Sequence, residues 1–213
     1  MPPTPANMET LVLVTRTVDD QTWIHTQRLG DSVQQLAAIA VRSPSPQLPV
    51  TSGSIGHLRA LDVLEAVLDE EAWIAAIADA LAPSATATFR VPLEGPVAWL
   101  DALNLYRYAQ DVIGVGKHLK ETQLKGWHRH YRTAELTELL SRHGLQVIAT
   151  EREGNPLLEA TQFAGLVWGG MIRHSSSTEE RLRAWRERKE DLSRLVHLGP
   201  LSTRVTMTVR KVA

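Results

Sequence analysis

The chain has 213 residues, which predicts a single domain at about 150 residues per domain. Apolar residues make up 43% of the chain and charged residues 22%, proportions typical of a folded globular protein rather than a disordered one. With 23 Lys and Arg against 24 Asp and Glu, and no cysteine, the sequence disfavours a dedicated nucleic-acid binder and excludes disulfides, thiolate catalysis and Cys-ligated metals.

The beginning of the chain carries no pattern typical of a targeting signal. No positive charge precedes Arg16, and the apolar run at 11–14 is shorter than the core of a signal peptide. No segment approaches the roughly 18 consecutive apolar residues of a membrane helix. We therefore expect a soluble, cytoplasmic protein that has no membrane partner.

The pattern of apolar and turn-forming residues predicts the strands. After an unstructured lead-in at 1–10, the expected strands lie at 11–17, 36–41, 57–63, 85–91, 145–151 and 203–209. The polar stretch at 18–35 is too irregular to predict an element, and 47–56 is expected to be a loop.

The expected helices lie at 71–81, 99–110, 133–143 and 178–196. Pro83 is predicted to end the first of them, Thr133 to cap the start of the third, and Gly144 to cap its end. A helical insertion at 154–200 precedes the last strand. Its helix at 178–196 carries charges of both signs, which favours a salt-bridged surface, or else a dimer contact.

Strands that alternate with helices predict an α/β domain with a mostly parallel sheet covered on both sides. We expect the whole of 1–213 to form this one domain.

Several segments, in chain order, resemble the class I S-adenosylmethionine-dependent methyltransferases, in particular the type 11-like branch that modifies small molecules and sugars. Residues 61–69 (LDVLEAVLD) are similar to the family's fourth strand and the turn after it, and 85–92 to its fifth strand, which ends in Val-Pro. The other similar segments are the helix at 71–81 with the turn at 82–85, the helix at 100–108, the histidine-containing helix entry at 127–136 (WHRHYRTAEL) and the helix exit at 141–145.

The resemblance implies a three-layer Rossmann-like methyltransferase fold: a mostly parallel sheet with an antiparallel last strand, for which we count about six strands. The resemblance also implies S-adenosylmethionine as cofactor and a small molecule or sugar as methyl acceptor.

The cofactor half of the chain departs from the family pattern. The family holds its cofactor at a glycine-rich turn after the first strand, where backbone N–H groups can approach the ligand. Here the first glycine is Gly30, and Val18-Asp19-Asp20-Gln21 follows the first predicted strand. The residues before His57 suffice for about two βα units of ~30 residues, where the family has three. We therefore expect an eroded donor site.

His128 and His130 are the candidate catalytic residues. A histidine near neutral pKa could remove the proton of a methyl acceptor, while alignment of the donor supplies most of the rate. The alternative is that both pack and cap at a helix entry. Their i, i+2 spacing is not the i, i+4 spacing of a helical zinc site, so no metal is expected.

Asp62 and Glu65 are the candidate cofactor-binding residues, since they follow the strand at 57–63 and open α/β sheets bind ligands at the carboxyl ends of their strands. A solvated acidic turn is the alternative interpretation. An apolar substrate pocket is the hypothesis for four aromatic residues, with core packing as the alternative. These residues are Trp99, Tyr106, Trp127 and Tyr131.

Three functions remain open from the sequence. The first is a shortened methyltransferase with a non-standard cofactor pocket. The second is a methyltransferase-like protein that has lost its donor site and acts as a binding or dimerisation partner of an active relative. The third is an enzyme that uses the vacated cleft for chemistry other than methyl transfer.

Overall fold

The structure is a computed structural model, which describes residues 9–18, 21–29, 33–41, 43–98, 101, 104–105, 108, 129–167 and 201–212. The chain divides into two compact units. The first unit contains Met1–Val91, Tyr131–Glu151 and Thr206–Ala213, and the second contains Pro92–His130 and Arg152–Val205. That the two fold as one domain, as the length predicts, stays a prediction.

The described strands form one seven-stranded sheet with the order β3-β2-β1-β4-β5-β7-β6. The strands are β1 (Glu9–Val18), β2 (Gln21–Leu29), β3 (Val33–Ala40), β4 (Ile55–Leu61), β5 (Leu81–Pro92), β6 (Leu145–Glu153) and β7 (Arg204–Lys211). The described helices are the short 3-10 helix η1 (Leu64–Ala66), α1 (Glu70–Ala80), α4 (Thr133–Arg142) and α5 (Pro156–Val167).

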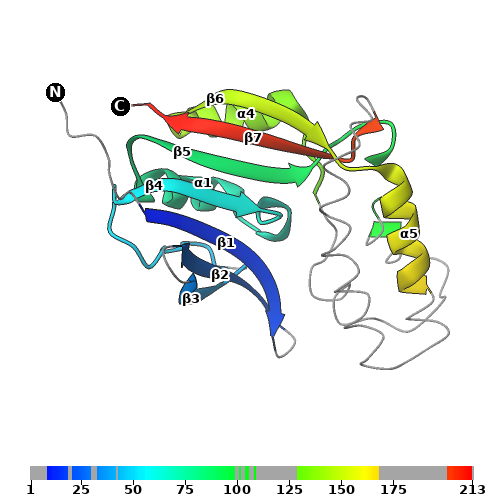
Figure 1. Cartoon of the computed structure of the whole chain (residues 1–213), viewed down its shortest axis with the longest axis horizontal. Helices are drawn as coiled ribbons and strands as arrows, with labels where there is room; N and C mark the ends of the chain where they lie inside the picture. Colours follow the sequence, from blue (N-terminus) through cyan, green and yellow to red (C-terminus); the bar gives the residue numbers. More distant parts are fainter. Residues whose placement is uncertain are drawn as a thin grey trace. The chain divides into compact units, whose positions relative to one another are not determined.

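The strand directions correct the expectation of six mostly parallel strands. β1 pairs with β4, and β4 with β5, in parallel. β1 pairs with β2, and β2 with β3, in antiparallel fashion, and Figure 1 shows β7 running opposite to its neighbours β5 and β6. The fold is therefore α/β with a mixed, largely antiparallel sheet. The expectation failed because it assumed a helix between successive strands, whereas β1, β2 and β3 follow one another directly.

Strand β2 lies in the stretch at 18–35 for which no element was predicted, so that expectation was wrong. Its apolar residues are few, and the strand is held mainly by main-chain bonds to both neighbours. Thr26 is buried, and its hydroxyl donates to the carbonyl of Ala37 at 3.1 Å and accepts from the Ala37 N–H at 3.0 Å. A polar side chain can be buried in a strand when it is bonded in this way, and apolar periodicity does not reveal it.

Along β4, β5 and β7 the core lies on one face of the sheet. Along β4 the alternate residues Leu58 and Ala60 are buried, whereas His57 and Arg59 are half-buried. The same alternation is found in β5 and β7, where Thr86, Thr88, Thr206 and Thr208 occupy the half-buried positions. Figure 1 draws α1 and α4 on the same side of the sheet. The connections between β1, β2 and β3 contain no described helix, and the expected three-layer arrangement stays a prediction.

Helix α1 confirms the helix expected at 71–81. It begins after Asp69, whose carboxylate accepts from the N–H of Ala72 at 2.9 Å, as an N-cap residue does. Pro83, however, does not end the helix: α1 stops at Ala80 and Pro83 lies at an exposed position inside β5. The expected strand at 57–63 ends earlier, because Asp62 adopts φ +55° and leaves the extended conformation.

The strands expected at 36–41, 85–91, 145–151 and 203–209 correspond to β3, β5, β6 and β7. Gly144 follows α4 with φ +70°, which confirms it as the C-terminal cap. Thr133 is the first residue of α4 rather than its N-cap, a position that Arg132 occupies. In the insertion at 154–200 the structure describes α5. The lead-in expected at 1–10 is wrong at its end, because Glu9 and Thr10 already pair in β1, and its residues 1–8 lie outside the described residues. Most of the helix expected at 99–110 and all of that at 178–196 also lie outside the described residues.

Candidate functional site

The candidate site lies at the carboxyl ends of β1, β4 and β5, which are parallel to one another. The chain passes from β1 outward to β2 and β3 and then returns to β4 on the other side of β1. This strand order, 3-2-1-4-5, is that of doubly wound sheets, which bind ligands outside the carboxyl ends of their strands where the order reverses. Thr15, Asp62 and Arg90 come together at that point.

Asp62 connects the three strand ends. Its N–H donates to the carbonyl of Arg90 at 3.0 Å, and its own carbonyl accepts from the hydroxyl of Thr15 at 2.9 Å. Its carboxylate forms an ion pair with the Arg90 guanidinium, in which Nε lies 3.2 Å from Oδ1 and Nη2 also contacts Oδ2. The Arg90 side chain is 8% exposed and that of Asp62 is 28% exposed. The carboxylate therefore faces solvent in part but is already neutralised by Arg90.

Glu65 lies on the same loop as Asp62, in the 3-10 turn η1 that follows β4. Its side chain is buried. The structure thus places both predicted cofactor-binding residues at the carboxyl end of β4. An exposed carboxylate edge such as that of Asp62 can accept a hydrogen bond from a hydroxyl or an amine; whether either residue contacts a cofactor stays a prediction.

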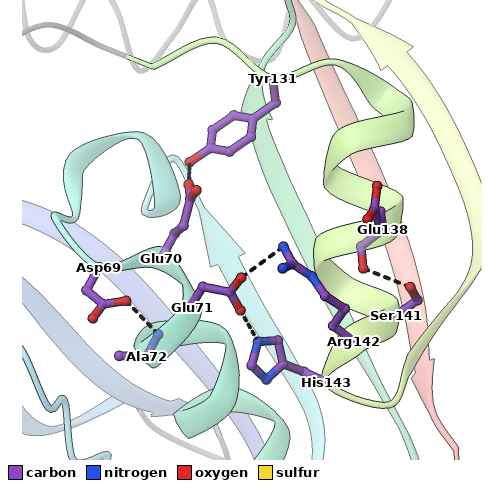
Figure 2. Close-up of polar contacts among 9 residues, drawn as sticks. All are labelled: Asp69, Glu70, Glu71, Ala72, Tyr131, Glu138, Ser141, Arg142 and His143. Carbon is purple, nitrogen blue, oxygen red and sulfur yellow. Dashed lines mark hydrogen bonds and ion pairs between the residues drawn. The ribbon is translucent and has the colours of Figure 1, made fainter.

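Tyr131 is fully buried and connects α1 with the segment that enters α4. Its hydroxyl donates to Oε2 of Glu70 at 2.7 Å and lies 3.1 Å from the carbonyl oxygen of Leu64, as Figure 2 shows for the first of these contacts. A buried tyrosine usually finds such a partner. This environment is that of a core residue, and its predicted role in substrate binding stays a prediction.

The two helices are joined further along by a second polar cluster. Figure 2 shows Glu71 of α1 between Arg142 and His143 at the end of α4, with Glu71 oxygens 2.9 Å from Nη2 of Arg142 and 2.6 Å from Nε2 of His143. These side chains are partly exposed, so solvent weakens the attraction. The cluster holds α1 to α4 and carries no sign of a ligand.

His130 belongs to the second unit, whereas Asp62 and Glu65 belong to the first. Its Nε2 lies 3.5 Å from Oδ2 of Asp101, and both side chains are mostly buried. Asp101 also accepts from the N–H of Asn104 through Oδ1 at 3.0 Å. A carboxylate beside a histidine is the arrangement that orients a general base. The other residues predicted for catalysis or substrate binding, His128, Trp99, Tyr106 and Trp127, lie outside the described residues.

Three residues of these clusters were missed from the sequence. Thr15 and Arg90 looked like ordinary polar positions of alternating strands, and only the pairing of β1, β4 and β5 brings them to Asp62. Asp101 lies inside the helix expected at 99–110, and only the structure shows that its side chain accepts from the N–H of Asn104, as an N-cap residue does.

The carboxyl end of β1 is built as a β-hairpin. Val18 lies opposite Gln21 and Thr17 opposite Thr22. The chain therefore passes from β1 to its antiparallel neighbour β2 through residues 19–20. A helix N-terminus, which presents free N–H groups to an anionic or nucleoside ligand, therefore does not follow this strand.

The residues described by the structure contain no group of three or more His, Asp or Glu side chains that could hold a metal ion. Within the same residues, no helix has the length and apolar character needed to span a membrane.

No protein-family model and no curated protein matches the chain. Solved structures are similar to it in fold. A candidate sarcosine dimethylglycine methyltransferase from Galdieria sulphuraria has a TM-score of 0.45 and 14% identity, over 78% of this chain and 56% of that one. The [4+2]-cyclase SpnF has a TM-score of 0.46 and 13% identity, over 83% and 55%. A geranyl diphosphate methyltransferase in complex with SAM has a TM-score of 0.40 and 9% identity, over 81% and 55%.

This chain thus spans little more than half the length of these structures. The structural similarity to S-adenosylmethionine methyltransferases is one of fold, at low sequence identity.

Proposed function

We propose that this chain is a methyltransferase-like binding or dimerisation partner, in which the usual site for the methyl donor has been replaced by a β-hairpin. The observation that carries the proposal is the antiparallel pairing of Val18 with Gln21 at the end of β1. In dinucleotide-binding α/β folds the turn at this point leads into a helix, and its main-chain N–H groups meet the ligand.

Strand pairing removes the groups that such a ligand needs. β1 pairs with β2 as far as Val18, whereas its pairing with β4 ends at Val14, so the main chain at 15–18 is bonded within the sheet on the β2 side. The sequence at 15–18 contains no glycine, the residue that close approach of a ligand to the main chain needs. The Asp62 carboxylate, the nearest candidate for a ribose hydroxyl, is paired with Arg90.

Calorimetry with S-adenosylmethionine and S-adenosylhomocysteine tests the proposal. We expect no heat of binding at high micromolar ligand, with circular dichroism confirming that the sample is folded and an active methyltransferase as the positive control. Saturable binding of either ligand at micromolar affinity would overturn the proposal.

The pair of His130 and Asp101 favours a second candidate, a methyltransferase that acts on a small molecule or a sugar. In that case His130 would accept the proton of the methyl acceptor while Asp101 orients the ring. If donor binding is found, His130→Ala should abolish methyl transfer and leave donor affinity unchanged. Unchanged turnover in that variant would remove His130 from the chemistry.

A further inference from the structure

Among the strands that the structure describes, β6 forms one edge of the sheet. Of its residues between Leu145 and Glu151, all but Leu145 and Val147 are exposed, and Ile148 is 44% exposed at the centre. An edge strand offers a row of main-chain donors and acceptors to a further strand. The part at 145–151 contains no lysine and no proline, the residues that commonly protect such an edge.

The opposite edge is built differently. Strand β3 pairs with β2 through a register shift between Thr26 and Gln27, and irregularities of this kind twist an edge away from further pairing. The two edges of one sheet therefore differ in how readily they accept another strand, and β6 is the more open one.

The sequence of β6 is complementary to itself when two copies run antiparallel about a twofold axis at Ile148. Each Ile148 then lies opposite the other copy's Ile148, Val147 opposite Ala149, and Gln146 opposite Thr150. Gln146, Ile148 and Thr150 share one face because side chains alternate along a strand. The pairing covers two exposed isoleucines and flanks them with amide and hydroxyl groups that can bond to each other.

Two other twofold registers are less favourable. A shift that centres the axis on Glu151 places two carboxylates opposite each other, and centring on Thr150 places Ile148 opposite Arg152. Like charges directly across a ladder are destabilising. The net charge of the chain is −1, so two copies approach with little overall repulsion.

We propose that a second copy of this chain pairs with β6, antiparallel and centred on Ile148, to give a dimer with one continuous sheet. The partner is a second copy because Ile148 meets its own counterpart and Gln146 meets Thr150 in this register. The same patch thus serves both partners, as a twofold interface requires. Edge pairing alone buries a small area, so the dimer is weak and forms with rising concentration. The biological role of this dimer rests on the proposed function, whereas the test of whether the dimer forms does not.

Sedimentation of the full chain without any cofactor tests the dimer. We expect a monomer–dimer equilibrium that Ile148→Lys weakens by about tenfold or more. Gln34→Lys, at an exposed position on the other edge strand β3, is the matched control and should leave the monomer–dimer equilibrium unchanged. A monomer at every concentration, or a dimer that Ile148→Lys does not weaken, would overturn the proposal.

Paired substitutions test the register of the dimer. They also test the dimer itself if the Ile148→Lys variant does not fold. Gln146→Lys with Thr150→Glu places opposite charges across the proposed ladder and should retain the dimer. Gln146→Lys with Thr150→Lys places like charges there and should dissociate it. The difference should shrink at about 1 M salt, where charges are screened beyond about 3 Å. Equal association of the two double variants would refute the register. Donor binding, if found, would refute the proposed function alone.

Discussion

The main chain and the side chain of Asp62 both bond to Arg90 across the carboxyl ends of two parallel strands. Asp62 holds φ +55°, a conformation that costs about 1–3 kcal/mol outside glycine and persists where the surroundings enforce it. Here the enforcing contacts are the Arg90 guanidinium, the Arg90 carbonyl and the Thr15 hydroxyl. The strained residue lies where the strand order reverses, which is where open α/β sheets place their ligands.

Removing Arg90 should destabilise the fold. Arg90→Ala leaves a partly buried carboxylate without its counter-ion, and we expect a loss of about 2 kcal/mol. This is less than the roughly 3–5 kcal/mol of a fully buried pair, because the Asp62 side chain is 28% exposed. Urea unfolding followed by circular dichroism measures the loss. Arg142→Ala, which breaks a pair that is 57% and 46% exposed, should cost less than about 1 kcal/mol, and equal losses would contradict the argument.

The hydroxyl of Tyr131 should contribute to stability. Tyr131→Phe removes a buried donor from Glu70, and we expect a loss of about 1–2 kcal/mol in the free energy of unfolding. Tyr108 is 50% exposed, so Tyr108→Phe makes the same chemical change without the burial and should have no measurable effect. If Tyr131→Phe also left the free energy of unfolding unchanged, the result would show that the contact with Glu70 is not formed in solution.

Acid should destabilise the protein through His57. Burial, and secondly the Arg59 guanidinium, hold the pKa of His57 below its ordinary value of 6.5. As the pH falls below about 6.5, the unfolded chain takes up a proton at this residue and the folded chain does not, so the free energy of unfolding decreases. His57→Gln should flatten that decrease when unfolding is measured at about pH 7.5 and 5.5.

The two causes of that pKa shift can be separated. Arg59→Met removes only the smaller one, so it should raise the pKa of His57 part of the way, as followed by its ring proton signals in NMR. A pH dependence of unfolding that is as steep in His57→Gln as in the unchanged protein would show that other groups produce it.

Gly144 should be needed for its backbone conformation alone. Its φ is +70°, and an added Cβ would meet no atom within 4 Å. Gly144→Ala therefore costs the strain of a left-handed residue, about 1 kcal/mol. An added Cβ at Gly95 also meets open space, with no positive φ, so Gly95→Ala should be neutral or slightly stabilising. Thermal unfolding of the two variants compares them directly, and a loss of equal size in both would exclude the backbone explanation.

Local patterns in the sequence predicted the elements that bury an apolar stripe. α1 and α4 follow from the spacing of their buried residues, and β5 and β7 from the alternation of apolar and polar residues. β2 was missed because its stability comes from two neighbouring strands, and no property of residues 21–29 read alone records which strands those are. The expectation that most strands run parallel was wrong for the same reason: strand directions depend on which strands become neighbours.

The candidate site shows the same division. Sequence patterns alone predicted that Asp62 and Glu65 follow a strand and that no glycine is available at the end of β1. The folded chain was needed to show that Arg90, 28 residues further along the chain, neutralises Asp62. It was also needed to show that a hairpin, and not a helix, follows β1. Spacing along the chain fixes which residues share a helix or a strand, whereas ion pairs and strand partners depend on contacts between distant segments, which form only when the sheet is assembled.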